Sequence, residues 1–129
     1  EEAISWLESL ALALGCKHTV RVTPAEHDAT IAYTSNLPHV TAVALMDSAS
    51  FNDKTRYFVA GSFRDGTRVA DINPELWSNL FLANKEKVAD EIDRYMEQLT
   101  LWRDALRSGD GEQLKAFMRT AGERRRELF

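Results

Sequence analysis

The chain has 129 residues, of which 44% are hydrophobic and 28% charged, and a formal net charge of −4. This length suits a single domain, and the composition argues against a disordered, fibrous or membrane-embedded chain. The negative charge balance argues against general nucleic-acid binding, so an anionic ligand would have to be bound by locally placed cations.

The single cysteine, Cys16, cannot form an internal disulfide. Together with the lack of a signal-peptide pattern at the start, this predicts a reducing, cytoplasmic location, with Cys16 as a buried and inert thiol. The sequence enters an amphipathic pattern directly at Glu1, which suggests a piece of a longer protein.

The first expected element is a helix over residues 3–14. Its apolar residues recur at helical spacing, and Gly15 stands where a left-handed cap would end the helix. Residues 19–22 alternate and are rich in β-branched side chains, which predicts one short strand. Because nothing downstream offers it a partner strand, we expect it to pair with a missing domain or with another copy of the chain.

A second helix is predicted to start at Thr23, which forms a capping box with Glu26. It should run to about Ser50, with a kink at Pro38, where one helical hydrogen bond is lost. Residues 37–46 are apolar on nearly every side, which predicts a central helix buried by its neighbours. This stretch is too short to span a bilayer.

The second half of the chain is expected to be helical after a loop over residues 51–60. A short helix is predicted over residues 62–70, and the sequence Asn73-Pro74 should open another that ends near Ala83.

A heptad pattern then predicts a helix of about 25 residues, or about 37 Å, that pairs with another helix. Its seam consists of Val88, Ile92, Tyr95, Leu99, Trp102 and Leu106. After a break at residues 109–111, a final helix is expected. The predicted fold is all-α, with one long kinked central helix, one long heptad-patterned helix and at most one short strand.

A polar stripe is predicted on the kinked helix. Asp28, Ser35 and His39 recur at helical spacing on an otherwise apolar segment, and Pro38 frees a backbone carbonyl beside them. Two interpretations stay open: a ligand site, or a core histidine whose hydrogen bonds are satisfied internally.

A second candidate site surrounds Arg64 and Arg68, which are one helical turn apart with Asp65 beside them. The planar guanidinium group suits a carboxylate or a phosphate. The alternative is a solvated surface helix with an internal ion pair. Trp77 is either a core aromatic residue or the apolar wall of a pocket.

The chain contains no dinucleotide fingerprint, P-loop, nucleophile elbow or CxxC motif. His27 and Asp28 adjoin as in some helical metal-dependent phosphohydrolases, but no further metal ligands are convincingly placed. The residues therefore predict no cofactor site and no metal site within this chain.

The order of several motifs is more specific than any one of them. These motifs are Glu26-His27-Asp28, Ser35-Asn36-Leu37-Pro38-His39, residues 60–70, Pro74-Glu75-Leu76-Trp77 and Asn84-Lys85. In this order and at these spacings, they resemble the C-terminal half of prephenate dehydrogenases. The resemblance covers essentially the whole chain.

The resemblance implies a homodimeric, NAD-dependent enzyme of tyrosine biosynthesis, which oxidises prephenate and releases carbon dioxide to give 4-hydroxyphenylpyruvate. It implies that residues 1–129 form the helical C-terminal domain, that the dinucleotide-binding N-terminal domain is absent from this chain, and that the chain alone is inactive. The choices between prephenate and arogenate, and between NAD and NADP, stay open, as does feedback inhibition by tyrosine. No nucleic-acid or membrane partner is expected.

The resemblance also implies which residues bind the substrate. Arg68 is expected to grip a substrate carboxylate and His39 to line the substrate pocket, with Ser35 and Trp77 beside it. No catalytic residue is expected in this chain, because the histidine that takes the substrate's proton belongs to the absent domain.

Three further residues are implied to support the site. His27 is expected to have a structural role, and Arg64 and Asp65 to lie near the pocket mouth, within reach of the neighbouring subunit's site. Asn36 stands where many relatives carry His and Ser62 where many carry Gly, which leaves the detailed shape of the pocket open.

Two other functions remain possible from the sequence. One is a non-enzymatic helical dimerisation module, in which the polar stripe is internal packing. The other is the helical domain of a different hydroxyacid dehydrogenase. The enzyme interpretation requires Arg68 and His39 to converge on one concave cavity.

Overall fold

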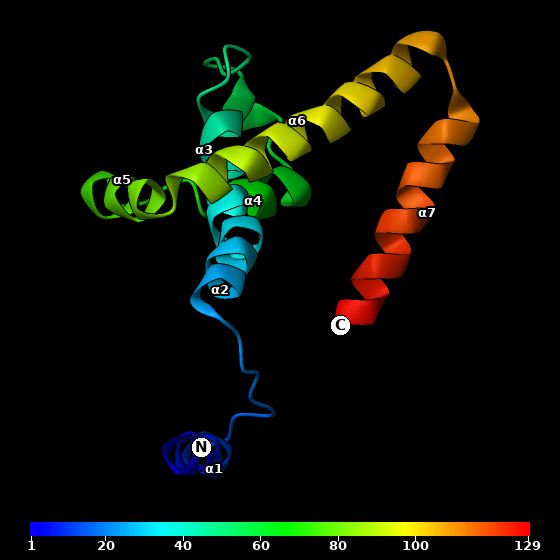
Figure 1. Ribbon diagram of the computed structural model, residues 1–129. Helices are drawn as coiled ribbons and strands as arrows, with labels where there is room; N and C mark the ends of the chain where they lie inside the picture. Colours follow the sequence, from blue (N-terminus) through cyan, green and yellow to red (C-terminus); the bar gives the residue numbers. More distant parts are fainter.

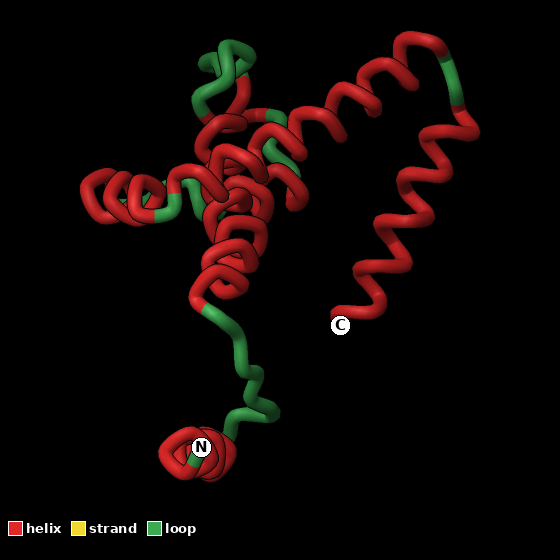
Figure 2. The backbone as a smooth tube through the Cα atoms, in the orientation of Figure 1, coloured by secondary structure: helices red, strands yellow, loops and turns green.

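The computed structural model describes all 129 residues and contains helices and loops but no strand (Figures 1 and 2). Its elements are α1 (Glu2–Ala13), α2 (Pro24–Ile31), the π-helical segment η1 (Ala32–Asn36), α3 (Leu37–Met46), the 3-10 turn η2 (Thr55–Tyr57), α4 (Gly61–Thr67), α5 (Pro74–Ala83), α6 (Lys85–Ser108) and α7 (Gly111–Leu128). The all-α prediction is confirmed. No helix combines the length and apolar character that crossing a bilayer requires.

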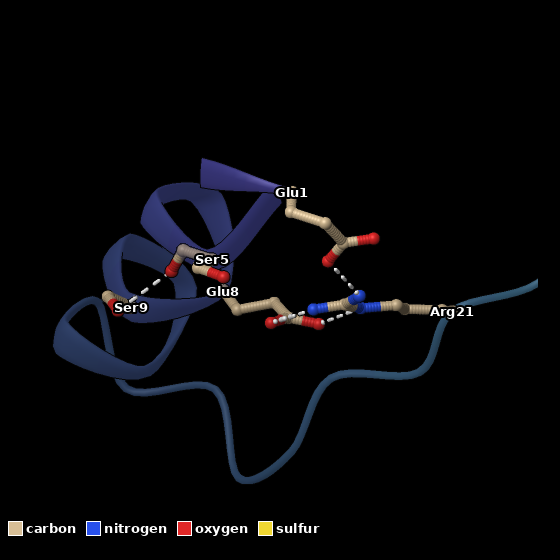
Figure 3. A network of polar contacts seen from close by, with 5 residues as sticks. All are labelled: Glu1, Ser5, Glu8, Ser9 and Arg21. Carbon is tan, nitrogen blue, oxygen red and sulfur yellow. Dashed lines mark hydrogen bonds and ion pairs between the residues drawn. The ribbon is translucent and has the colours of Figure 1, made fainter. Parts of the chain in front are cut away.

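Helix α1 lies apart from the other helices (Figure 1). Gly15 follows it with a positive φ of 98°, as expected for a left-handed cap. The segment after it turns back so that Arg21 donates hydrogen bonds to Glu8 at 2.7 and 2.8 Å and to Glu1 at 3.1 Å (Figure 3). The bonds from Arg21 to Glu8 lower the pKa of the Glu8 carboxyl.

Residues 19–22 form no strand within the chain, which holds no second strand to pair with their backbone groups, so the fold keeps to the predicted limit of at most one strand. One prediction for this region is wrong. Cys16 is exposed rather than buried, because it follows α1 in a segment that lies apart from the other helices.

The helices α2 and α3 and the segment η1 between them form one continuous rod (Figure 1). The predicted capping box is confirmed: Thr23 Oγ1 accepts from the Glu26 N–H, and Glu26 Oε2 accepts from the Thr23 N–H. The kink predicted at Pro38 takes the form of a wider π turn, in which the Leu37 N–H donates to the Ala32 carbonyl. The rod ends at Met46, one turn earlier than predicted.

The short helices α4 and α5 confirm the two short helices predicted from the sequence. Asn73 caps α5, with its side-chain oxygen accepting from the Leu76 N–H. The long helix α6 crosses the rod, and α7 turns back from its far end (Figure 1). Gly109, with a φ of 71°, ends α6 in the left-handed conformation. Helices α6 and α7 contact each other through the rings of Trp102 and Phe117, whose centroids lie 5.4 Å apart.

The core of the single chain is small and sits where η1, α3 and α6 meet. Only six residues are buried: Ala32, Asn36, Leu37, Ala42, Val88 and Ala105. Many large apolar side chains stay exposed, including Tyr95, Leu99 and Leu106 of the heptad seam. A chain of this size usually buries most of its apolar side chains, so these surfaces are suited to contact with other polypeptide.

The capping box at the start of α2 gives a pH-dependent prediction. The Thr23 N–H donates to the Glu26 carboxylate and lowers its pKa below the ordinary 4.5. The stabilisation is therefore present above pH 4.5 and is lost as the pH falls through the lowered pKa. We predict that Glu26→Ala lowers the denaturation midpoint at pH 7, and that its difference from the unchanged protein shrinks as the pH falls below 4.5 and the Glu26 carboxyl becomes protonated.

The matched control is Glu75→Ala, which removes an acidic residue from the first turn of α5 without breaking a cap hydrogen bond. A difference between Glu26→Ala and the unchanged protein that persists at low pH would contradict the capping role.

Candidate functional site

The rod and α5 meet through two stacked rings. His39 projects from α3 and Trp77 from α5, with ring centroids 3.8 Å apart and an angle of 29° between the ring planes. Both side chains are partly buried. Phe81 lies one turn further along α5, 5.5 Å from the Trp77 ring. The stack joins the imidazole of α3 and the indole of α5 in one aromatic cluster.

A backbone hydrogen bond orients the His39 ring. Its Nδ1 lies 2.8 Å from the main-chain carbonyl oxygen of Ser35. Because a carbonyl oxygen only accepts, the proton of a neutral imidazole must sit on Nδ1. The other nitrogen, Nε2, then has a lone pair and can accept a hydrogen bond from a ligand hydroxyl.

Ser35 lies on the wide π turn directly before Pro38. Its carbonyl holds the His39 ring, and its hydroxyl makes no hydrogen bond within the chain. The structure thus brings together three of the four residues predicted to bind substrate: Ser35, His39 and Trp77. The sequence pattern alone could not show that the carbonyl of Ser35, rather than its hydroxyl, holds His39.

The fourth predicted residue, Arg68, is exposed directly after α4, which packs against α3. Its guanidinium group forms no hydrogen bond or ion pair within the chain, and neither do the side chains of Arg64 and Asp65. The internal ion pair expected for a solvated surface helix is therefore not formed. A guanidinium group stays charged at any physiological pH, so α4 and the residue that follows it carry two unneutralised cations beside the rod.

No hydrogen bond joins Arg68 to His39. The chain does form a groove of about 700 Å³ between α3 and α6, lined mainly by apolar residues such as Val40, Leu45 and Leu99. This groove contains neither Arg68 nor His39. The shared cavity for these two residues, and their role in substrate binding, stay predictions.

Of the three residues expected to support the site, His27 lies on α2, while Arg64 and Asp65 lie on α4. His27 Nδ1 is 3.2 Å from the Asp28 carboxylate, and both side chains are more than half exposed. The main-chain carbonyl of Asp28 accepts a hydrogen bond of 2.8 Å from the Asn84 side chain. The motif Asn84-Lys85 gave no sign of this bond, because it joins residues 56 positions apart. Asn36 is buried in the core, and its side-chain oxygen has no partner within the chain.

The stack gives a prediction that needs no knowledge of function. We expect Trp77→Leu to move the His39 ring-proton resonances downfield, because the shielding by the indole ring is lost. The measurement is an NMR spectrum with isotope-labelled histidine. His18, which lies on the separate segment after α1, serves as the internal control and should not shift. Unchanged His39 resonances would show that the two rings do not stack in solution.

Comparison with known proteins decides the family. Residues 23–120 match the family described as "Prephenate dehydrogenase, dimerization domain". The chain belongs to this family. Prephenate dehydrogenase of Bacillus subtilis is 30% identical over 129 residues, which cover 97% of this chain and 34% of that protein. Cyclohexadienyl dehydrogenase of Zymomonas mobilis is 40% identical over 93 residues, which cover 68% of this chain and 32% of that protein.

Solved structures agree with this family membership. The crystal structure of Synechocystis arogenate dehydrogenase superposes with a TM-score of 0.85 at 25% identity, over 99% of this chain and 48% of that one. Prephenate dehydrogenase from A. aeolicus, in complex with hydroxyphenyl propionate and NAD+, gives a TM-score of 0.69 at 31% identity, over 84% of this chain and 39% of that one.

The chain spans about a third of the length of the curated relatives it matches. The match to the dimerization-domain family begins at residue 23, at the N-cap of α2. Helix α1 and the segment after it therefore lie outside that match, although the Bacillus subtilis relative is aligned over nearly the whole chain.

Proposed function

We propose that this chain is the helical, substrate-binding and dimerising part of a prephenate dehydrogenase. The complete enzyme would carry out the NAD-dependent oxidative decarboxylation of prephenate to 4-hydroxyphenylpyruvate, a step of tyrosine biosynthesis. The observation that supports this most directly is the oriented His39–Trp77 stack, in a chain of this family and beside a helix with unneutralised arginines.

The chemistry of the substrate fits these side chains. Prephenate carries two carboxylates, so its site needs fixed cations, and Arg68 offers a permanently charged guanidinium that can bind a carboxylate with two hydrogen bonds. His39 is assigned to hydrogen bonding at the pyruvyl side of the substrate, with Ser35 and Trp77 beside it. The A. aeolicus relative, which was solved with an aromatic carboxylate, supports a ligand of this class.

The cofactor is assigned to the part of the protein outside these residues. NAD accepts a hydride from the substrate, while loss of carbon dioxide and aromatisation supply the driving force. The 129 residues contain no strand, so they offer no strand, glycine turn and helix to bind a pyrophosphate. We place NAD or NADP, and the group that takes the substrate's proton, in an N-terminal domain. The present residues hold and orient the substrate, and alone they should show no turnover.

We assign α1 and the segment after it to contact with that N-terminal domain. Helix α1 buries no residue and exposes the apolar side chains of Ile4, Leu7 and Leu10. The longer relatives have about two thirds of their length outside the matched region, which is enough for a domain to cover this face. In this assignment, residues 23–129 form the helical domain proper.

The role of Arg68 is tested in the full-length enzyme. We expect Arg68→Ala to raise the KM for prephenate at least about 30-fold, because a substrate carboxylate would lose its charged partner. Steady-state kinetics measures the change. The control is Arg56→Ala, which removes an arginine of the loop before α4 and should leave the KM unchanged. An unaltered KM for Arg68→Ala would reject its role and favour a purely structural module.

We also propose that the chain forms a homodimer through the exposed seam of α6 and the groove beside it. The seam residues Ile92, Tyr95 and Leu99 line this groove together with apolar residues of α3. A heptad seam of this kind buries its apolar side chains by pairing with another helix. In the dimer, Arg64 and Asp65 are assigned to the mouth of the pocket, within reach of the neighbouring subunit's site.

Sedimentation tests the dimer interface. We expect Leu99→Arg to convert the dimer to monomer at micromolar concentration, because a charge would be buried in an apolar contact. The matched control is Thr100→Arg, which adds the same charge at the next position of α6, off the heptad seam. A dimer that survives Leu99→Arg would place the interface elsewhere.

Three finer assignments belong to the same proposal. We propose prephenate rather than arogenate as the substrate, and the ratio of the kcat/KM values for the two compounds decides between them. Tyrosine, which also carries an aromatic ring and a carboxylate, is proposed as a competing feedback inhibitor. The single free cysteine supports a location in the reducing cytoplasm.

A further inference from the structure

Asn84 joins two parts of the fold that are far apart in the sequence. It sits between α5 and α6, and its side-chain Nδ2 donates a hydrogen bond of 2.8 Å to the main-chain carbonyl of Asp28, across 56 positions of sequence. Within residues 23–129, every other side-chain hydrogen bond links residues at most four positions apart. Asn84 therefore provides the one polar side-chain link between the α5–α6 junction and the rod.

The acceptor of this bond lies at a sensitive point of the rod. Asp28 belongs to the last turn of α2, and its carbonyl also accepts the N–H of Ala32, the first residue of the π segment. A carbonyl oxygen can accept two hydrogen bonds, so both donors are satisfied there. Asn84 thus holds the rod where it changes from α-helix to the wider turn that carries Ser35.

Helix α5 has few other attachments. It projects sideways from the bundle and buries none of its residues (Figure 1). At its first turn it meets the rod through the stack of Trp77 on His39, and at its end through Asn84. These two points lie seven residues apart, or about 10 Å along a helix. With the second point removed, α5 could pivot about the stack.

We propose that Asn84 is a positioning residue of the substrate site. By holding the end of α5 against the Asp28 carbonyl, it sets the Trp77 ring against His39 and so shapes the surface on which the substrate binds. This inference rests on the proposed function for its effect on the substrate, but its effect on the stack is independent of that function.

The test is Asn84→Asp in the full-length enzyme. The carboxylate has the same shape as the amide but no N–H to donate, so it would face the Asp28 carbonyl with a repelling charge. We expect the KM for prephenate to rise about fivefold, the equivalent of one net hydrogen bond, with a much smaller change in kcat. A protonated carboxyl can donate again, so the ratio of the variant KM to that of the unchanged enzyme should fall as the pH is lowered from 7 toward 5.

The matched control is Asn79→Asp, which introduces the same charge at an exposed asparagine of α5 whose side chain makes no hydrogen bond. It should change neither the KM nor its pH dependence. An Asn84→Asp variant that matches this control in both respects would overturn the proposal.

A second measurement separates this inference from the proposed function. The His39 ring-proton resonances should move downfield in Asn84→Asp, part of the way to their position in Trp77→Leu, whether or not the protein oxidises prephenate. Unchanged resonances would overturn the positioning role, even if the KM had risen or the stability had fallen. If the resonances move but the unchanged full-length protein neither binds nor oxidises prephenate, the proposed function fails and the positioning of the stack stands.

Discussion

The candidate site depends on one arrangement, the stack of His39 on Trp77 with the His39 ring held by the Ser35 carbonyl. The hydrogen bond and the stack each restrict a different movement of the His39 ring. The carbonyl bond selects the Nδ1 tautomer and the tilt of the imidazole, while the indole covers one ring face. The π turn before Pro38 changes the register of the rod between these residues. A loss of any one part would leave an imidazole on α3 without a defined direction for its Nε2 atom.

The stack also explains why the site needs tertiary support. Helix α5 is short and exposed, and a helix of this length has little stability by itself. Its position relative to the rod comes from side-chain contacts at its two ends, one aromatic and one polar. A site built in this way is sensitive to residues that lie outside it, which is the physical basis of the role proposed for Asn84.

The second main property of the chain is that much of its apolar surface stays exposed. With six buried residues and no large side chain fully enclosed, the chain does not complete a core of its own. Two of its exposed apolar regions lie apart from each other, one on α1 and one along the α6 seam and the adjoining groove. This separation is the reason for proposing two different contacts, one at α1 and one along α6. The charged α4 lies beside the rod and packs against α3.

Local signals in the sequence determined most of the helices. Caps at Thr23 and Asn73, the left-handed glycines and the heptad spacing of α6 act through neighbouring residues, so they can be identified without a fold. The motif order also identified the family, which the later match over residues 23–120 confirmed. Only the tertiary structure decided the features that depend on contacts between distant residues. It showed that residues 19–22 have no partner strand, that Cys16 is exposed and that the kink is a π turn. It also showed that His39 stacks on Trp77 and that Asn84 bonds to Asp28. These features join segments up to 56 positions apart, and no pattern of neighbouring residues specifies which distant groups will meet.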